Sequence, residues 1–191
     1  MPEPATPSTP AWPRGRSRHG GIDEVPLASS IATDGAGRLW LCGKHAVGPD
    51  PEAVLAEIAA TTIVCLAERF ELADRYPAYV EWLDANRGGR AVWYPVPDLH
   101  APAAAQVVPL LDGLRGRLLG GESLLIHCAA GIGRSGTIAV CLLITMGLSA
   151  DDALRHVAAH RPMAGPEAGP QVDLVAAISR FVTGPGPACS S

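Results

Sequence analysis

An apolar segment ends in a glycine-spaced loop that leads into a second apolar segment, and this arrangement constrains the fold more than any other feature of the chain. Residues 123–126 are apolar and short, as in a buried strand, and residues 138–146 are apolar almost all round, as in a buried helix. The loop between them reads His127-Cys128-Ala129-Ala130-Gly131-Ile132-Gly133-Arg134-Ser135-Gly136-Thr137. A loop that enters a helix N-terminus can turn its backbone N–H groups inward and bind an anion.

Two side chains of this loop, Cys128 and Arg134, are chemically able to act on a bound phosphate. The field at a helix N-terminus favours the thiolate form of a cysteine, which is its nucleophilic form. Arginine presents a planar fork that fits phosphate oxygens, which the point charge of lysine does not reproduce. A buried, inert thiol is the ordinary alternative for a cysteine, and the position of Cys128 between a strand and a helix argues against it.

The rest of the chain alternates strands with helices, which predicts an α/β fold in a single domain, with a mostly parallel central sheet flanked by helices. Strands are expected at residues 39–42, 62–66 and 91–94, and helices at 51–60, 77–86, 103–119, 150–160 and 171–182. Asp50 is expected to cap the first of these helices, and Ser149 with Asp152 to form a capping box. Pro109 should kink its helix or lie in the first turn.

Length, charge and cysteine content narrow the class of protein. The 191 residues suit one domain with a substantial core, and a net charge of −4 argues against a strongly basic nucleic-acid binder. No stretch is long enough for a membrane span, and the N-terminus lacks the apolar core of a secretory signal. Five cysteines without disulfide-like spacing favour a reducing, cytoplasmic compartment. We expect a disordered Pro/Arg-containing arm at 1–21, the domain at 22–183 and a flexible tail at 184–191.

Three segments resemble a known family. The run from His127 to Thr137 resembles the signature loop of the cysteine-dependent protein tyrosine phosphatase superfamily, and the size and layout of the chain are more like its small dual-specificity branch. Trp93-Tyr94-Pro95-Val96-Pro97-Asp98 resembles the mobile loop that carries the family's acid. Cys65-Leu66-Ala67-Glu68-Arg69 resembles a strand-end segment of dual-specificity and lipid-phosphatase relatives. The resemblance runs from about Val25 to Val182 and implies the phosphotyrosine phosphatase-like fold.

The resemblance implies a reaction in two steps that needs no metal and no cofactor. Cys128 attacks phosphorus and forms a thiophosphoryl intermediate, which water then hydrolyses. Asp98 protonates the departing oxygen and then deprotonates the water. The phosphate is bound by the Arg134 side chain and by backbone N–H groups of the loop. The residues expected to bind phosphate are Ala129, Ala130, Gly131, Ile132, Gly133 and Arg134.

The assignment of the acid has alternatives. Asp98 lies between two prolines of the segment Pro95 to Pro102, which follows a predicted strand and can swing as a unit. An aspartate in this setting is more commonly a solvated turn residue. Glu68 and Asp74 are the next candidates for the same role.

Three further residues have both a supporting role and an ordinary structural one. Ser135 lies where the family places a hydroxyl that hydrogen-bonds the thiolate; the ordinary alternative is a helix N-cap, and the two roles are compatible. His127 is expected to orient the loop and favour the thiolate, or to be a satisfied core histidine. Gln171 resembles a glutamine that contacts the catalytic water in some relatives, and capping or plain surface exposure is the alternative.

The remaining histidines and cysteines suggest little other chemistry. His45 follows Cys42 closely, and His156 precedes His160 by four residues, but neither pair completes a zinc site. Cys42 or Cys65 could form a reversible disulfide with Cys128, although buried cysteines are usually inert.

The substrate class follows from the neutral side chains of the loop. Lipid-phosphatase relatives tend to carry lysines where this chain has Ala129, Ala130 and Ile132. A neutral loop favours a singly phosphorylated group, so the expected partner is a phosphorylated protein or peptide, with phosphotyrosine and also phosphoserine or phosphothreonine as substrate groups. The alternatives are a phosphatase for phosphoinositides or other small phosphoesters, and a catalytically silent phosphate-binding module.

Overall fold

The computed structural model describes residues 21–184, in which five strands and eight helices alternate along the chain. The strands are β1 (Ile22–Glu24), β2 (Leu39–Gly43), β3 (Thr62–Cys65), β4 (Ala91–Trp93) and β5 (Leu124–Cys128). The helices are α1 (Lys44–Val47), α2 (Pro51–Glu57), α3 (Arg69–Ala73), α4 (Pro77–Ala85), α5 (Ala104–Leu119), α6 (Gly133–Thr145), α7 (Ala150–His160) and α8 (Gly169–Thr183). The arm and tail expected at residues 1–20 and 185–191 lie outside the described part, and their disorder stays a prediction.

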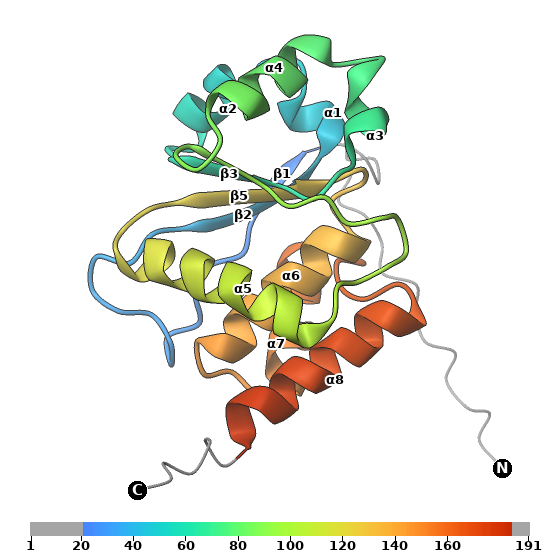
Figure 1. Ribbon diagram of the computed structural model, residues 1–191. Helices are drawn as coiled ribbons and strands as arrows, with labels where there is room; N and C mark the ends of the chain where they lie inside the picture. Colours follow the sequence, from blue (N-terminus) through green and yellow to red (C-terminus); the bar gives the residue numbers. More distant parts are fainter. Residues whose placement is uncertain (1–20, 185–191) are drawn as a thin grey trace, which may run out of the picture.

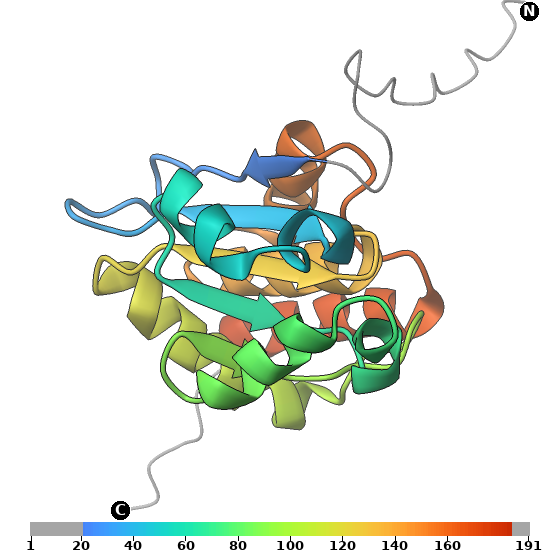
Figure 2. The same ribbon diagram turned by 90° about the horizontal axis from the view of Figure 1, so that it is seen from above.

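The strands form one sheet in the order β1-β2-β5-β3-β4, in which only β1 runs antiparallel to its neighbour (Figure 2). Helices α1–α4 cover one face of the sheet and α5–α8 cover the other (Figure 1). The α/β fold with a mostly parallel central sheet is therefore confirmed. Strand β5 lies at the centre of the sheet, so its carboxyl end opens into the region where parallel α/β sheets place their ligand sites.

Strand β5 is buried along its whole length and supplies both halves of the core. Leu124, Ile126 and Cys128 pack toward α5–α8, whereas Leu125 packs toward α2 and α4. This alternation follows from the period of two along a strand. His127 of β5 lies between two cysteines of the neighbouring strands. It pairs with Cys42 of β2 on one side and with Cys65 of β3 on the other.

Two expected helix boundaries differ in the structure. The helix expected to reach residue 60 ends at Glu57, because Ala59 has a left-handed φ of 51° and the Ala60 N–H donates to the Leu55 carbonyl at 3.0 Å. The helix expected from residue 138 begins at Gly133, so part of the signature run is its first turn. The expected N-cap at Asp50 is confirmed, because its carboxylate accepts from the Ala53 N–H at 2.9 Å. Ser149 also caps its helix by accepting from the Asp152 N–H at 3.1 Å, but the Asp152 carboxylate accepts from the Ser149 hydroxyl, so only half of the expected capping box forms.

Other local features were not expected. Pro109 lies inside α5, beyond its first turn. The short elements β1, α1 and α3 have too few residues to show a periodic pattern, so the sequence does not predict them. Helix α3 proves important, because it brings a carboxylate to the end of β5.

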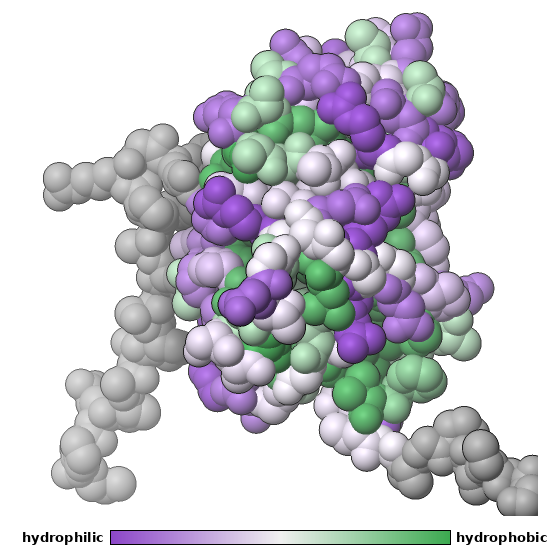
Figure 3. Space-filling view, turned by 90° about the vertical axis from the view of Figure 1, so that its left-hand side faces the viewer, coloured by the Kyte–Doolittle hydropathy of each residue, from purple (hydrophilic) through white to green (hydrophobic). Residues whose placement is uncertain are grey.

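The end of the molecule away from the carboxyl ends of the parallel strands shows mixed polar and apolar residues (Figure 3). Apolar residues gather there at the lower edge, beside the carboxyl end of α8. Phe181 and Val182 near that end of α8 are exposed. The loop between β5 and α6 lies at the opposite end.

Candidate active site

The segment that joins β5 to α6, residues 128–133, is called the cysteine loop below. Cys128 is the last residue of β5 and is 3% exposed. Gly131 has a left-handed φ of 74°, and a Cβ at this position would collide with the carbonyl of Cys42. Only glycine fits both conditions without strain. The close passage of the loop over the end of β2 thus depends on Gly131.

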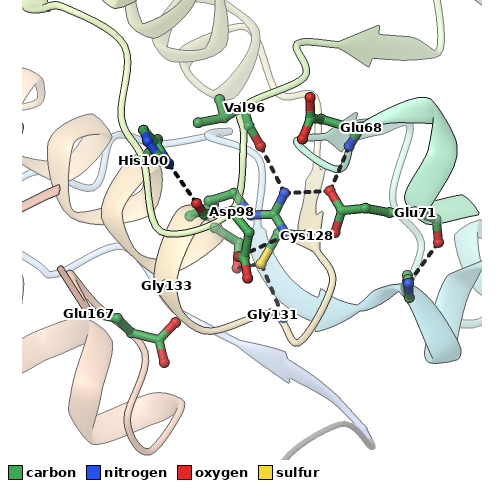
Figure 4. A network of polar contacts seen from close by, with 12 residues as sticks. Glu68, Glu71, Val96, Asp98, His100, Cys128, Gly131, Gly133 and Glu167 are labelled. Carbon is green, nitrogen blue, oxygen red and sulfur yellow. Dashed lines mark hydrogen bonds and ion pairs between the residues drawn. The ribbon is translucent and has the colours of Figure 1, made fainter. Parts of the chain in front are cut away.

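The sulfur of Cys128 has two polar neighbours (Figure 4). The Gly131 N–H lies 3.3 Å from Sγ, and the Ser135 hydroxyl lies 3.4 Å from it. Ser135 is fully buried and lies inside the first turn of α6, whose N-cap is Ile132. The structure therefore has Ser135 in contact with the sulfur and not at the N-cap position.

A buried arginine that the sequence analysis missed, Arg161, holds the cysteine loop from behind. Its side chain is fully buried; Nε donates to the Gly131 carbonyl at 2.5 Å, Nη2 to the Ala130 carbonyl at 3.0 Å, and Nη1 to Asp23 at 2.7 Å. In a planar trans peptide the C=O and the next N–H point in opposite directions. Because these two carbonyls point to Arg161, the N–H groups of Gly131 and Ile132 point away from it, and that of Gly131 reaches the sulfur.

Arg134 lies in the first turn of α6 and is 3% exposed. Its Nη1 and Nη2 donate to the two carboxylate oxygens of Glu71 at 2.6 and 2.8 Å, and Nη1 also donates to the Val96 carbonyl at 2.8 Å. Burial works against the guanidinium charge, but Glu71 and Asp98 raise the pKa of Arg134 above its ordinary value. Nε is buried and has no hydrogen-bond partner within residues 21–184. An anion at the loop would provide one.

Glu71, on α3, is the second residue that the sequence analysis missed. Burial raises the pKa of its carboxyl, but the Arg134 pairing and the Glu68 N–H outweigh burial and lower it, so Glu71 is ionised at neutral pH. Glu68 forms a capping box with Glu71 at the start of α3, and Asp74 is exposed at the end of this helix. The spacing of Glu68 and Glu71, three positions apart, is typical of the start of a helix, but it does not predict that Glu71 pairs with Arg134.

Asp98 lies on residues 95–102, called the acid loop below, and comes within reach of the cysteine loop. Its carboxylate lies 3.2 Å from Arg134 Nη2, and its side chain is 71% exposed (Figure 4). The backbone carbonyl of Asp98 lies 2.7 Å from His100 Nδ1. Among the three carboxylates considered as the acid, Asp98 is the one whose side chain contacts Arg134.

His127 is buried beneath the cysteine loop and is neutral. Burial lowers its pKa to about 4, so the ring carries no charge at pH 7. Nδ1 lies 3.2 Å from the Cys128 carbonyl, and Nε2 lies 2.6 Å from the Tyr79 hydroxyl. Because a carbonyl only accepts, Nδ1 carries the proton and Nε2 accepts from Tyr79. His127 therefore contacts the Cys128 carbonyl as a neutral hydrogen-bond donor and brings no positive charge to the loop.

Gln171 is buried in the first turn of α8 and is neither surface-exposed nor a helix cap. Its Oε1 accepts from the Glu167 N–H at 2.8 Å and from the Thr137 hydroxyl at 3.4 Å. Its Nε2 donates to the His100 carbonyl at 3.4 Å. The amide thereby links the acid loop, α6 and the start of α8.

The cysteines considered as redox partners lie on the other face of the sheet. Cys42 and Cys65 belong to the core cluster under α2 and α4, whereas Cys128 belongs to the cluster under α5–α8. Burial raises the pKa of the Cys42 thiol to about 12 and raises that of Cys65 as well. Both thiols are protonated at neutral pH, and their placement does not favour a disulfide with Cys128.

Other histidines and acidic residues form no further cluster in the described chain. Among residues 21–184, no group of three or more His, Cys, Asp or Glu side chains is close enough together to hold a metal ion. Within the same range, no helix has the length and apolar character required to cross a bilayer.

Comparisons with known proteins agree with this geometry. Residues 41–171 match the family described as "Swiss Army Knife protein, DSP-PTPase phosphatase domain". The chain is 51% identical over 43 residues to human dual specificity protein phosphatase 8, a match that covers 22% of this chain but only 7% of that protein. The chain therefore spans a small part of the curated relative that it matches.

Solved structures extend the likeness over most of the chain. Tk-PTP in its active form is 28% identical, with a TM-score of 0.61 over 81% of this chain and 97% of Tk-PTP. A kinase associated phosphatase with its catalytic cysteine changed to serine shares the fold, with 21% identity and a TM-score of 0.71 over 86% of this chain and 97% of that one. The matched family segment covers more than half of this chain and includes both Cys128 and Arg134, so the chain belongs to the dual-specificity-type protein tyrosine phosphatase domain family.

Proposed function

We propose that this protein hydrolyses phosphate monoesters on phosphoproteins through a covalent intermediate on Cys128. One observation carries the proposal. The Cys128 sulfur is in contact with the Gly131 N–H and the Ser135 hydroxyl, next to the buried Arg134 guanidinium. The Nε atom of this guanidinium has no hydrogen-bond partner in the described chain. A fixed cation with an unused donor beside a sulfur suits an anionic group that the sulfur attacks.

In the first step, the Cys128 thiolate attacks phosphorus and the bond to the leaving oxygen breaks. Arg134 and the N–H groups of residues 129–134 stabilise the oxygens of the transferring group. Asp98 gives its proton to the leaving oxygen. Its carboxylate lies 3.2 Å from Arg134 and is largely exposed, so it can meet a substrate that enters over the cysteine loop.

In the second step, water attacks the phosphorus and the sulfur leaves as thiolate. Asp98, now ionised, takes a proton from the water. The Ser135 hydroxyl, 3.4 Å from Sγ, donates a hydrogen bond to the departing thiolate and eases this step. The resemblance assigns Gln171 to contact with this water, and its hydrogen bonds with the Glu167 N–H and the His100 carbonyl hold its amide between the acid loop and the start of α8. The chain's own side chains supply every proton transfer in this scheme.

The neutral cysteine loop supports a protein substrate over a polyphosphorylated lipid. The side chains of Ala129, Ala130 and Ile132 add no charge beyond that of Arg134. A polyanionic head group would require more cations than this loop offers. We therefore propose phosphotyrosine, and also phosphoserine and phosphothreonine, as substrate groups.

A substrate panel tests the proposal. Wild-type protein and Cys128→Ser are incubated with a phosphotyrosine peptide, a phosphoserine peptide and phosphoinositide vesicles, and phosphate release is measured. We expect the wild type to favour the peptides and Cys128→Ser to release none while still binding vanadate. Preference for the phosphoinositide would contradict the protein-substrate assignment, and binding without turnover by the wild type would indicate a silent phosphate-binding module.

A further inference from the structure

A small hollow, called the arginine pocket below, lies beside the root of the acid loop. Its lining residues come from separate elements: Arg69 begins α3, Arg87 follows α4, Trp93 ends β4 and Pro95 opens the acid loop. The hollow has a volume of about 140 Å³. This volume equals the share of about five water molecules in the liquid, so the pocket accommodates the end of one side chain.

Two positive charges and one negative charge surround the arginine pocket. Arg69 and Arg87 each donate from Nη2 to one carboxylate oxygen of Asp84, at 2.6 and 3.0 Å. These hydrogen bonds lower the pKa of the Asp84 carboxyl, so it is ionised at neutral pH. The Nε and Nη1 atoms of both arginines have no hydrogen-bond partner among residues 21–184. Two guanidiniums against one carboxylate leave one positive charge here, on a chain whose net charge is −4.

The ring of Trp93 holds both guanidiniums in place. The central carbon of Arg69 lies 4.7 Å from the ring centroid and that of Arg87 lies 5.2 Å from it, within cation–π range. The ring is itself fixed, because Trp93 Nε1 donates to the Ala67 carbonyl at 2.9 Å. Donors that are already positioned lose little side-chain freedom when a ligand binds. The apolar surfaces of Trp93 and Pro95 suit the aliphatic stem of an acidic side chain.

The arginine pocket adjoins the residues that hold Arg134. Glu71 of α3 and Val96 of the acid loop both contact the Arg134 guanidinium (Figure 4). Arg69 precedes the first of these residues by two positions, and Pro95 precedes the second by one. A peptide bound over the cysteine loop therefore passes close to the pocket.

Strand pairing sets the distance between the pocket and the cysteine loop. Cys65 of β3 pairs with Trp93 of β4 on one side and with His127 of β5 on the other. Two strand spacings, about 10 Å, thus separate Trp93 from His127. An extended peptide covers this distance in about three residues, at about 3.3 Å per residue.

We propose that the arginine pocket binds an acidic side chain of the peptide substrate, about three residues from the phosphorylated one; this proposal rests on the proposed function. The group recognised is an anion on a side chain, either the carboxylate of Asp or Glu or the phosphate of a second phosphorylated residue. Asp84 occupies one nitrogen of each guanidinium, and the substrate anion accepts from the others. Arg69 and Arg87 are in this account specificity-determining residues.

Phosphotyrosine peptides that differ at one position test the proposal. They carry glutamate, phosphoserine, alanine or lysine three residues before or after the phosphotyrosine, and mass spectrometry follows loss of phosphate from the tyrosine. For the wild type we expect kcat/KM to be about fivefold higher with glutamate than with alanine on one of the two sides, as for an exposed ion pair of good geometry. A gain with phosphoserine alone would assign the pocket to a second phosphate. Equal values for all four residues on both sides would overturn the proposal.

A charge reversal separates recognition from a structural role. Arg87→Glu leaves one guanidinium against two carboxylates, so the favoured residue should change from glutamate to lysine. Arg90→Gln is the matched control, because Arg90 pairs with Glu52 at 2.7 Å and lies 5.7 Å from the Trp82 ring, outside the pocket. Its ratio of kcat/KM for the glutamate and alanine peptides should equal that of the wild type. Each ratio compares two peptides on one protein, so a general loss of activity cancels.

The remaining outcomes distinguish this proposal from the proposed function. A glutamate preference that persists in Arg87→Glu would overturn the assignment of the pocket. So would slower phosphoinositide hydrolysis by Arg87→Glu with unchanged peptide ratios, because the pocket would then serve a lipid head group. A wild type that hydrolyses every peptide equally overturns this proposal alone, whereas a wild type that hydrolyses none of them overturns the proposed function as well.

Discussion

The cysteine loop and the acid loop meet at the same end of the sheet, but the residue expected to react is buried in the first and exposed in the second. The carbonyls of Ala130 and Gly131 are bound to a fully buried Arg161, and the Cys128 carbonyl is bound to a buried His127. In the acid loop the carbonyls of Val96 and His100 are likewise bound to buried side chains, but Asp98 and Leu99, which lie between them, have largely exposed side chains.

The two loops therefore suit two different tasks, which are binding of the transferring phosphoryl group and protonation of the leaving group. Donors that bind the transferring group are most effective when they are fixed before the substrate arrives. An acid that must meet varied leaving groups benefits from a loop with few buried contacts, since such segments have low local stability. The same comparison predicts that substitutions in the cysteine loop and its supports impair every substrate, whereas substitutions in the acid loop depend on the leaving group.

The largest effect, after loss of the cysteine itself, is expected for Arg134→Lys. The substitution retains a positive charge but loses the planar fork that faces Glu71 and the anion. We expect kcat to fall by about 10²–10³-fold, as for removal of a preorganised donor. Steady-state kinetics with aryl phosphates of different leaving groups measure it. A loss that disappears for good leaving groups would contradict the fixed role of this residue.

The acid loop is tested by Asp98→Ala. The reaction should slow by roughly a hundredfold or more with a poor leaving group, because general acid catalysis is lost. The loss should be small when the leaving group departs without a proton. Plotting log kcat/KM against the leaving-group pKa for wild type and variant checks this. Parallel lines for the two proteins would move the acid role away from Asp98, with Glu68 as the next candidate.

The buried support of the cysteine loop makes stability depend on pH through His127. Its pKa is about 4 in the folded protein, below its unfolded value, so the unfolded state binds the proton more readily between these values. The free energy of unfolding should therefore fall by about 2 kcal/mol between pH 7 and pH 5 through this residue alone. Urea titrations at both pH values, on wild type and His127→Gln, measure the difference.

The control for that measurement is His100→Gln, which removes an exposed histidine of the acid loop. This variant should retain the wild-type dependence of unfolding on pH, whereas His127→Gln should lose most of it. If His100→Gln and His127→Gln lose the same part of the pH dependence of unfolding, that dependence does not come from the buried His127 ring.

The smallest effect is expected for Ser135→Ala. The hydroxyl lies 3.4 Å from the sulfur and is proposed to assist its departure, so kcat should fall by about tenfold, the equivalent of one hydrogen bond to a charged group. The value of kcat/KM should change little, since the thiolate leaves only in the second step. A larger loss in kcat/KM than in kcat would place the role of Ser135 in the first step.

The sequence predicts those site residues that lie close to one another along the chain. Cys128, Gly131, Arg134 and Ser135 follow one another within one run, and the strand and helix that flank this run have clear apolar patterns. The resemblance added Asp98, and the structure brings Asp98 to Arg134. The α/β order of the elements likewise followed from alternating patterns, although helix ends were misplaced by a few residues.

The residues that hold the site from a distance had no comparable signal. Arg134 and Glu71 are 63 positions apart, Arg161 and Asp23 are 138 apart, and His127 and Tyr79 are 48 apart. A single sequence does not show which arginine will be buried or which carboxylate it will meet, because that depends on the packing of β1, α3 and α4 around the sheet.

The central claim, that the Cys128 sulfur carries the phosphoryl group, is tested most directly by trapping the intermediate. Wild-type protein turning over an aryl phosphate is quenched and digested, and its peptides are examined by mass spectrometry, with Cys128→Ser treated in parallel. The account predicts phosphate on the peptide that contains Cys128, attached to sulfur, in the wild type alone. Turnover by the wild type with phosphate on another residue, or with no phosphorylated peptide under conditions that slow the second step, would contradict it.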